Sequence, residues 1–105
     1  MFPFRRPVGI VSTQPGYTPY HVAALTAGTA LKTGSGVLHA VVINTRGATG
    51  NLLTLYDGAS TAGSVLAVID TTAAVGSLRF DAAFLVGLFA VLAVGTAADL
   101  TIAAA

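Results

Sequence analysis

The sequence predicts an all-β protein, a jelly-roll-like antiparallel β-sandwich of about seven or eight short strands behind an extended N-terminal arm. Apolar runs of about four to nine residues recur about every ten to fourteen residues, and turn residues separate them. Val, Ile, Leu, Thr and aromatic residues dominate these runs, as they do in strands. Helix signals are poor, because the chain has no Glu and carries a glycine every few residues.

Eight apolar runs define the expected strands. They are His21–Thr26, Thr29–Thr33, Val37–Thr45, Asn51–Tyr56, Ser64–Asp70, Ser77–Phe84, Leu88–Val94 and Asp99–Ala104. Glycine lies in or beside most of the intervening segments, and Asp57-Gly58 is a typical turn dipeptide. The runs therefore predict strands joined by short turns.

Alternation of apolar and polar residues is clearest in the run that begins at Ser77. Leu78, Phe80 and Ala82 are expected to point inward, and Arg79 and Asp81 outward. This run predicts a strand with one face on the core and one in solvent.

The run Val37–Thr45 is instead apolar on both faces. Alternation places Val37, Val41 and Ile43 on one side and Leu38, Ala40 and Val42 on the other. Because antiparallel sheets normally expose one face to water, such strands indicate a sheet that a partner protein covers.

Residues 1–20 form the expected arm, and residues 21–105 the sandwich domain. All four prolines lie in the arm, and proline fixes φ and removes a hydrogen-bond donor from a sheet. The expected interface residues are Phe2, Phe4, Arg5, Arg6, Tyr17 and Tyr20. Aromatic residues and arginine are the usual anchors of interfaces. The arm either wraps around its own domain or docks on a neighbouring subunit, and the sequence leaves both open.

The composition excludes several classes of protein. With 54% hydrophobic and 9% charged residues, the 105-residue chain has the opposite of a disordered composition. Five Lys and Arg against four acidic residues make no basic surface, so no nucleic-acid partner is expected. Without cysteine there is no disulfide and no thiol nucleophile. A net charge of +1 favours association, which leaves a membrane protein or a subunit of an assembly.

Residues 82–98 are the candidate membrane span. They carry no charge, and as a helix they would reach about 25 Å, at the short limit for a bilayer. No Lys or Arg cluster flanks them, and Gly87 and Gly95 divide them into pieces of strand length, so we expect no membrane partner. Arg5-Arg6 resembles the start of an export signal. A proline follows without an apolar stretch of about 7–15 residues, so no cleavable signal is expected.

The histidines and carboxylates match no catalytic or metal-binding spacing, so we expect no metal, no cofactor and no enzymatic activity. Gly34-Ser35-Gly36 lacks the spacing of a nucleophile elbow, and Arg46–Gly50 lacks the Gly-Lys-Ser/Thr of a phosphate loop. His39 is expected to be a packed or interface residue. His21, where the arm meets the domain, is a candidate pH-sensitive contact.

Two aspartates precede turn residues. Asp57 stands before Gly58, and Asp70 before Thr71-Thr72. Short Asp side chains commonly accept hydrogen bonds from the backbone of their own turn. We therefore expect both to stabilise local turns.

Several short segments of the sequence resemble small structural proteins of tailed-bacteriophage virions. These are Lys32–His39, Leu53–Gly58, Ala67–Thr72, Phe80–Phe84 and Gly87-Leu88, and the likeness covers roughly residues 29–102. The resemblance implies a compact β-sandwich on phage particles, either a capsid decoration or cement protein or a part of a fibre or spike. It implies a location on the capsid surface after assembly in the host cytoplasm.

We therefore expect a non-enzymatic subunit that stabilises the phage head lattice by burying apolar strand faces and its arm against other subunits. Its expected partners are the major capsid protein or other virion proteins, and further copies of itself, with a trimer favoured. One alternative is a fibre, spike or tail-associated module that binds the host surface through Tyr56 and the loop Arg46–Gly50. The other is a small membrane protein that spans the bilayer with residues 82–98.

Overall fold

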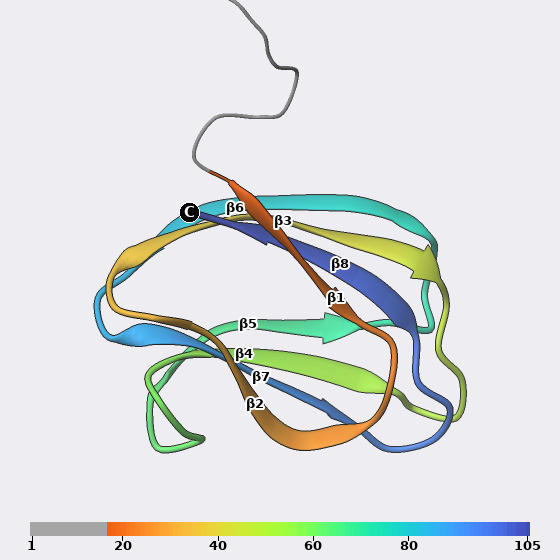
Figure 1. The fold of residues 1–105 in the computed structure, drawn as a ribbon. Helices are drawn as coiled ribbons and strands as arrows, with labels where there is room; N and C mark the ends of the chain where they lie inside the picture. Colours follow the sequence, from red (N-terminus) through yellow and green to blue (C-terminus); the bar gives the residue numbers. More distant parts are fainter. Residues whose placement is uncertain (1–16) are drawn as a thin grey trace, which may run out of the picture.

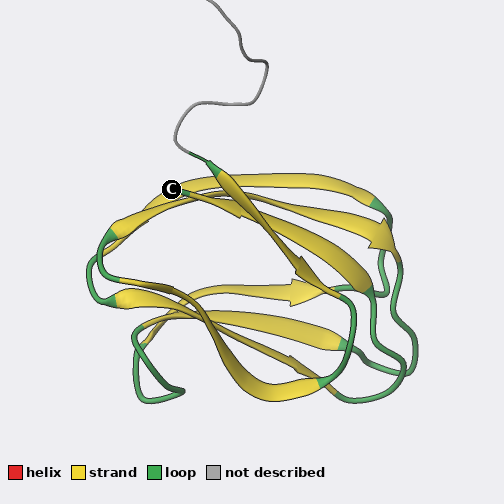
Figure 2. Cartoon of the chain, viewed as in Figure 1, coloured by secondary structure: helices red, strands yellow, loops and turns green. Residues whose placement is uncertain are grey.

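The structure is a computed structural model that describes residues 17–105, and within this range the chain forms eight strands and no helix (Figures 1 and 2). The strands are β1 (Thr18–Val22), β2 (Thr26–Thr33), β3 (Gly36–Thr45), β4 (Leu52–Asp57), β5 (Ser64–Asp70), β6 (Gly76–Phe84), β7 (Gly87–Ala93) and β8 (Asp99–Ala104). They build two packed four-stranded sheets. The predicted all-β fold is confirmed.

The first sheet has the order β1-β8-β3-β6 and the second sheet the order β2-β7-β4-β5. All paired neighbours are antiparallel. Most consecutive strands lie in different sheets, and only β4 and β5 form a hairpin within one sheet. Eight strands wound in this way between two sheets form a jelly roll.

The first strand lies earlier in the sequence than expected. The prediction placed it at His21–Thr26, but β1 spans Thr18–Val22 and Thr26 begins β2. The last residues of the predicted arm, including Pro19, are therefore part of the first sheet. Proline is tolerated there because β1 is an edge strand with a neighbour on one side only. The missing N–H of proline would break the hydrogen bonding of a central strand, but an edge strand can accommodate it.

The core lies between the two sheets and consists of the inward-facing residues of both. Its largest fully buried side chains include Leu38 and Val41 of β3, Leu53 and Leu55 of β4, Phe84 of β6, Leu88 and Leu92 of β7, and Leu100 and Ile102 of β8. Each buried aliphatic or aromatic side chain contributes about 1.5–3 kcal/mol relative to exposure. The apolar runs of the sequence therefore stabilise the sandwich mainly through these positions.

A β-bulge at His39 overturns the predicted alternation of β3. Leu38 lies opposite Ala104 of β8 and Ala40 opposite Ala103, so His39 is an extra residue of β3 without a partner in β8. The bulge shifts the phase of the strand, and Leu38 is buried on the same side as Val41. The prediction that Leu38 lies on the opposite face from Val41 and Ile43 was wrong for this reason.

The predicted alternation of β6 holds for most of its residues. Phe80 and Ala82 are half-buried, and Arg79 and Asp81 are exposed. Leu78 lies opposite the buried Val41, on the core side, but is 41% exposed. Its exposure follows from its position on an edge strand, which has a neighbour on one side only.

The helical span considered for residues 82–98 is wrong. These residues form the end of β6, all of β7 and the connection to β8. Among residues 17–105, no helix is long and apolar enough to cross a membrane.

Candidate functional site

The outer face of the second sheet is apolar. The register places the side chains of alternate residues of β4, β5 and β7 on this side, together with Ala30 of β2. We call this surface the apolar face; it comprises Ala30, Leu52, Thr54, Tyr56, Val65, Val68, Phe89, Val91 and Ala93. Val65 is 55% and Val68 58% exposed, and these nine residues carry no charge. The register also places the exposed Asp70, opposite Leu52 at the end of β5, at the border of this surface. Large exposed apolar surfaces are typical of interaction sites, which makes this face the candidate site.

Two aromatic rings stand on the apolar face. The ring centroids of Tyr56 and Phe89 lie 6.4 Å apart, and the rings are tilted by 59°. Phe89 also lies directly against Gly28 of β2, where an added Cβ would come within 2.3 Å of the ring. Glycine at this position therefore leaves the room that the Phe89 ring occupies, and neighbouring strands hold both rings in place.

The outer face of the first sheet is polar by comparison. His21 Nε2 lies 2.7 Å from Asp99 Oδ1, and the Asn44 side-chain amide donates hydrogen bonds to Asp99 at 3.2 Å and to the Thr101 hydroxyl at 3.0 Å. The hydrogen bond from His21 and then that from Asn44 hold the pKa of Asp99 below its usual value. His21 is thus paired with a carboxylate at the surface.

A second histidine–aspartate pair lies at the β3 bulge. His39 Nδ1 lies 2.7 Å from Asp81 Oδ1, and Asp81 adopts a left-handed backbone with a φ of 51°. Tyr17 stacks on the His39 ring with a centroid separation of 4.2 Å. The three side chains tie the entry of β1 to the centre and the edge of the first sheet. Across residues 17–105 no three His or Asp side chains come together to hold a metal.

The predicted interface residues fall into three groups. Tyr17 is half-buried against His39, where it lies on the outer face of the first sheet. Tyr20 instead packs against the core, so it is a contact within its own domain. The other four, Phe2, Phe4, Arg5 and Arg6, lie outside the described residues.

Asp57, the last residue of β4, does not stabilise its own turn as predicted but the turn between β6 and β7. The Asp57 carboxylate accepts hydrogen bonds from the backbone N–H groups of Leu85 at 2.9 Å, Val86 at 2.8 Å and Gly87 at 3.4 Å. It therefore fixes the turn between β6 and β7, where Leu85 is 78% and Val86 59% exposed. Asp70 does bond locally, to the N–H of Thr72 at 2.9 Å, as predicted.

We expect Asp57→Asn to lower the midpoint of thermal unfolding at neutral pH and to weaken the acid sensitivity of the domain. The N–H groups of Leu85 and Val86 hold the pKa of Asp57 below its usual value of 3.8. A carboxyl whose pKa is lower in the folded state stabilises the protein above its unfolded pKa, and this contribution is lost as pH falls through the folded pKa.

Thermal unfolding of the wild type and the Asp57→Asn variant between about pH 7 and about pH 2 measures this effect. The gap between the two midpoints is expected to narrow below the ordinary pKa of aspartate. A gap that stays constant down to the lowest pH would show that the carboxylate does not act through its charge.

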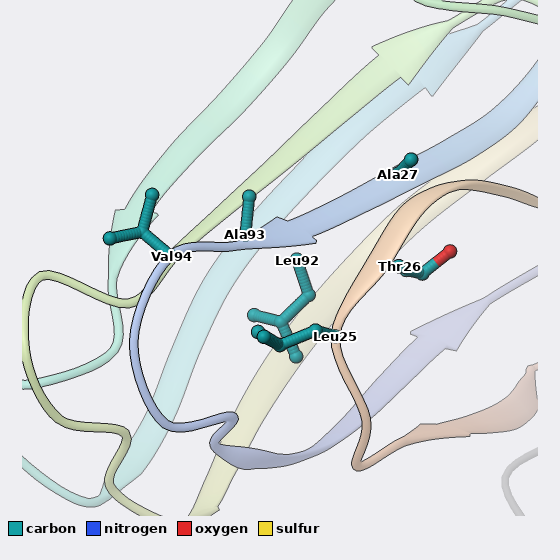
Figure 3. A pocket seen from close by; sticks show the side chains of 6 residues that line it. All are labelled: Leu25, Thr26, Ala27, Leu92, Ala93 and Val94. Carbon is teal, nitrogen blue, oxygen red and sulfur yellow. The ribbon is translucent and has the colours of Figure 1, made fainter.

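The opposite end of the sandwich carries a shallow groove of about 270 Å³ between the β1–β2 connection and the end of β7 (Figure 3). Its lining consists of Leu25, Thr26, Ala27, Leu92, Ala93 and Val94. Thr26 supplies the one polar side chain among these six residues. The groove therefore presents no acid, base or charged group to a bound molecule.

The two elements of the predicted host-binding site do not meet. Tyr56 lies near the end of β4, beside Asp57, whereas the loop Arg46–Gly50 precedes the first residue of that strand. A strand rises about 3.3 Å per residue, so the length of β4 separates them. The structure does not bring them into one groove.

The sequence matches no family model and no curated protein. The fold is similar to that of the Drosophila NLP core, a solved structure that provides insight into pentamer formation and histone binding. The two chains align with a TM-score of 0.56 over 85% of this chain and 95% of the other, at 9% sequence identity. At this identity the likeness shows the shared fold.

Proposed function

We propose that this protein is a non-enzymatic structural subunit of a tailed-bacteriophage virion, a capsid decoration or cement protein that acts as a homo-oligomer. The apolar face is the observation that supports assembly into a homo-oligomer, and the resemblance of Lys32–His39 and the other segments to virion proteins is what suggests the virion. The apolar face presents exposed Val65 and Val68 beside the paired rings of Tyr56 and Phe89. Its burial stabilises an assembly by about 25 cal/mol for each Å² of apolar area, before the costs of association.

The low charge of the chain supports self-association. A formal net charge of +1 gives little repulsion between copies. The pentamer described for the Drosophila NLP core supports a homo-oligomer on this fold, and the trimer expected from the sequence stays a prediction. Histone binding is not carried over, because only four acidic residues oppose five basic ones in the whole chain.

Adding two lysines to the apolar face is expected to dissociate the oligomer. In Val65→Lys/Val68→Lys, two ammonium groups would have to be buried in the contact, with Asp70 at the end of the same strand to offset part of one charge, and we expect the dissociation constant between copies to rise roughly 100-fold or more. The matched control is Ser77→Lys/Ala83→Lys, which adds the same charge to exposed positions of the edge strand of the other sheet. Native mass spectrometry measures the mass of each assembly, and thermal unfolding verifies that both variants fold.

Equal masses for the wild type and the Val65→Lys/Val68→Lys variant would contradict assembly through the apolar face.

Quantitative mass spectrometry of purified phage particles tests where in the virion the protein lies. Copies on the order of hundreds per particle are expected for a cement protein. A dozen or fewer would instead indicate a vertex, fibre or tail component.

A further inference from the structure

We infer that the turn between β6 and β7 of one copy inserts into the groove at the opposite end of the sandwich in another copy. This inference rests on the proposed homo-oligomer and names a contact that links its subunits. The inserting side chains are Leu85 and Val86, which we call the apolar tip. The receiving surface is the groove shown in Figure 3, between the β1–β2 connection and the end of β7.

The apolar tip is exposed to an unusual degree for its chemistry. Leu85, at 78%, has the highest exposed fraction among the large hydrophobic side chains of residues 17–105, and its neighbour Val86 is also exposed. Tight turns mostly carry glycine, proline, asparagine, aspartate or serine. Two adjoining apolar side chains at the end of the sandwich therefore indicate a surface that a partner covers.

The backbone of the apolar tip is held in place before any partner binds. The Asp57 carboxylate accepts hydrogen bonds from the N–H groups of Leu85 and Val86, and the Gly34 N–H donates to the Val86 carbonyl at 2.9 Å. Binding therefore has to order little more than two side chains, which lowers its entropic cost. The N–H of Gly87 also faces the carboxylate, so the charge of Asp57 keeps its hydrogen-bond partners inside a contact.

The groove matches the apolar tip in chemistry. Its lining includes the fully buried Leu92 and the exposed Leu25 and Val94, and it contains no charged or titratable side chain. Two other hollows do contain one. A hollow of about 260 Å³ that adjoins the groove across Leu25 has His21 in its lining, and one of about 150 Å³ at the β5–β6 connection has Asp70. The uncharged groove is the one that an apolar side chain can fill without covering a polar group.

The charged residues around the contact do not oppose it. Those at the groove end of the sandwich are Arg46, Asp70 and Asp99, and none of them lines the groove. Asp70 lies two strands across from the groove residue Ala93, about 10 Å away by ordinary strand spacing. At the other end, Lys32 and Asp57 carry opposite charges. Docking the two ends therefore brings no cluster of like charges together.

The backbone at Val94 supports a role for its side chain. Val94 has a φ of 71°, a left-handed conformation that β-branched residues rarely adopt and that glycine adopts readily. The buried Asn51 amide holds this residue by donating a hydrogen bond to its carbonyl at 2.9 Å. The turn thus keeps an exposed valine where glycine would cause less strain. Such strain is typical of positions where the side chain itself has a function.

Another copy has to supply the apolar tip. The tip precedes the first residue of β7, and the groove lies at the last residues of the same strand. A strand of seven residues separates the two by about 20 Å, so they cannot meet within one chain. Repeated from copy to copy, such a head-to-tail contact closes a ring when the rotation allows it.

The contact also continues the apolar face. Ala93 belongs both to the groove and to this face. Two inserted side chains alone bury far less than the roughly 800 Å² per partner of a typical stable interface. We therefore assign the apolar tip the role of an anchor at the edge of a larger contact that includes the apolar face.

Disulfide trapping tests the contact directly, because the chain has no cysteine of its own. Full-length Leu85→Cys protein is mixed, under oxidising conditions, with full-length Val94→Cys or Leu25→Cys protein. We expect mixed dimers, identified by their mass, at least roughly tenfold above the control, because only docked copies bring the two Cα atoms within about 4.4–6.8 Å. The control partner is Val75→Cys. Val75 is 60% exposed against 62% for Val94, and it lies at the same end of the sandwich but outside the groove.

A second variant, Val94→Gly, separates assembly from folding. Glycine relieves the left-handed backbone, so the midpoint of thermal unfolding is expected to stay at or above that of the wild type. Assembly is expected to weaken, with a dissociation constant between copies that rises roughly tenfold, because the groove loses an apolar wall. Native mass spectrometry measures the assembly, and Val75→Gly is the control that should leave it unchanged.

Each outcome bears on the inference. Mixed dimers of Leu85→Cys with a groove cysteine support it, as does weaker assembly of Val94→Gly at undiminished stability. If the wild type is an oligomer but neither groove cysteine cross-links above Val75→Cys, the contact is overturned while the homo-oligomer stands. An oligomer that Val94→Gly leaves unchanged also contradicts the contact. A wild-type protein that is monomeric overturns the inference and the proposed homo-oligomer together.

Discussion

Replacing Asn51 with alanine is expected to lower the free energy of unfolding by about 3–5 kcal/mol. The Asn51 side chain is fully buried. Its amide N–H groups donate hydrogen bonds to the carbonyls of Val94 at 2.9 Å and Ala93 at 3.3 Å. Its oxygen accepts bonds from the Thr71 hydroxyl at 2.7 Å and the Ala98 N–H at 3.0 Å.

The large effect follows from what alanine would leave behind. Four polar groups, one at the end of β7 and three in the β5–β6 and β7–β8 connections, would lose a partner inside the protein. Each such group costs about 1–3 kcal/mol, partly relieved by relaxation. Gly47 of the β3–β4 loop packs against the same network, since a Cβ there would lie 2.5 Å from the Asn51 oxygen. One side chain therefore joins three connections at this end of the sandwich.

Asn44→Ala is the matched control, because Asn44 is an exposed asparagine that also bonds two side chains. It is expected to cost less than about 1 kcal/mol, since water replaces its bonds. Urea unfolding of both variants and the wild type gives the free energies. Equal losses for the two variants would show that the buried network does not hold the loops together.

Local patterns in the sequence predicted the strands but not the contacts between them. The run Ser64–Asp70 coincides with β5, and the run Asp99–Ala104 with β8, because composition and turn residues act over a few neighbours. The His39 bulge left no such local signal. It depends on the pairing of β3 with both β6 and β8, which are far away in the sequence.

The polar contacts were missed for the same reason. His21 and Asp99 are separated by 78 positions, and His39 and Asp81 by 42. Asp57 preceded a glycine and therefore indicated a local turn, yet its carboxylate binds a turn about thirty residues later in the chain. Asn51 at the start of an apolar run gave no sign of being buried.

An apolar outer face was predicted, but the sequence did not indicate where its most exposed residues would lie. The sequence indicated strands with two apolar faces from the run Val37–Thr45. In the structure the bulge in that strand directs Leu38 inward, and the exposed valines lie on β5 of the second sheet. Only the register of paired strands decides which apolar residues share an outer face.

Phe84→Ala is expected to lower the free energy of unfolding by about 3–5 kcal/mol. Phe84 is 1% exposed and is the largest fully buried side chain of the core. It lies opposite Gly36 at the start of β3, where an added Cβ would come within 2.8 Å of the ring. The ring therefore fills the space that this glycine leaves open, and its removal creates a cavity between the sheets.

Phe89→Ala serves as the control, because Phe89 is a half-buried ring of the same size on the apolar face. It is expected to cost the folded domain less, since its removal opens a surface depression that water can fill rather than a closed cavity. In the oligomer the order reverses: Phe89→Ala should weaken assembly, and Phe84→Ala should not. Urea unfolding and native mass spectrometry of the two variants separate these effects. If both lost stability and assembly to the same extent, the division into a core face and an assembly face would be wrong.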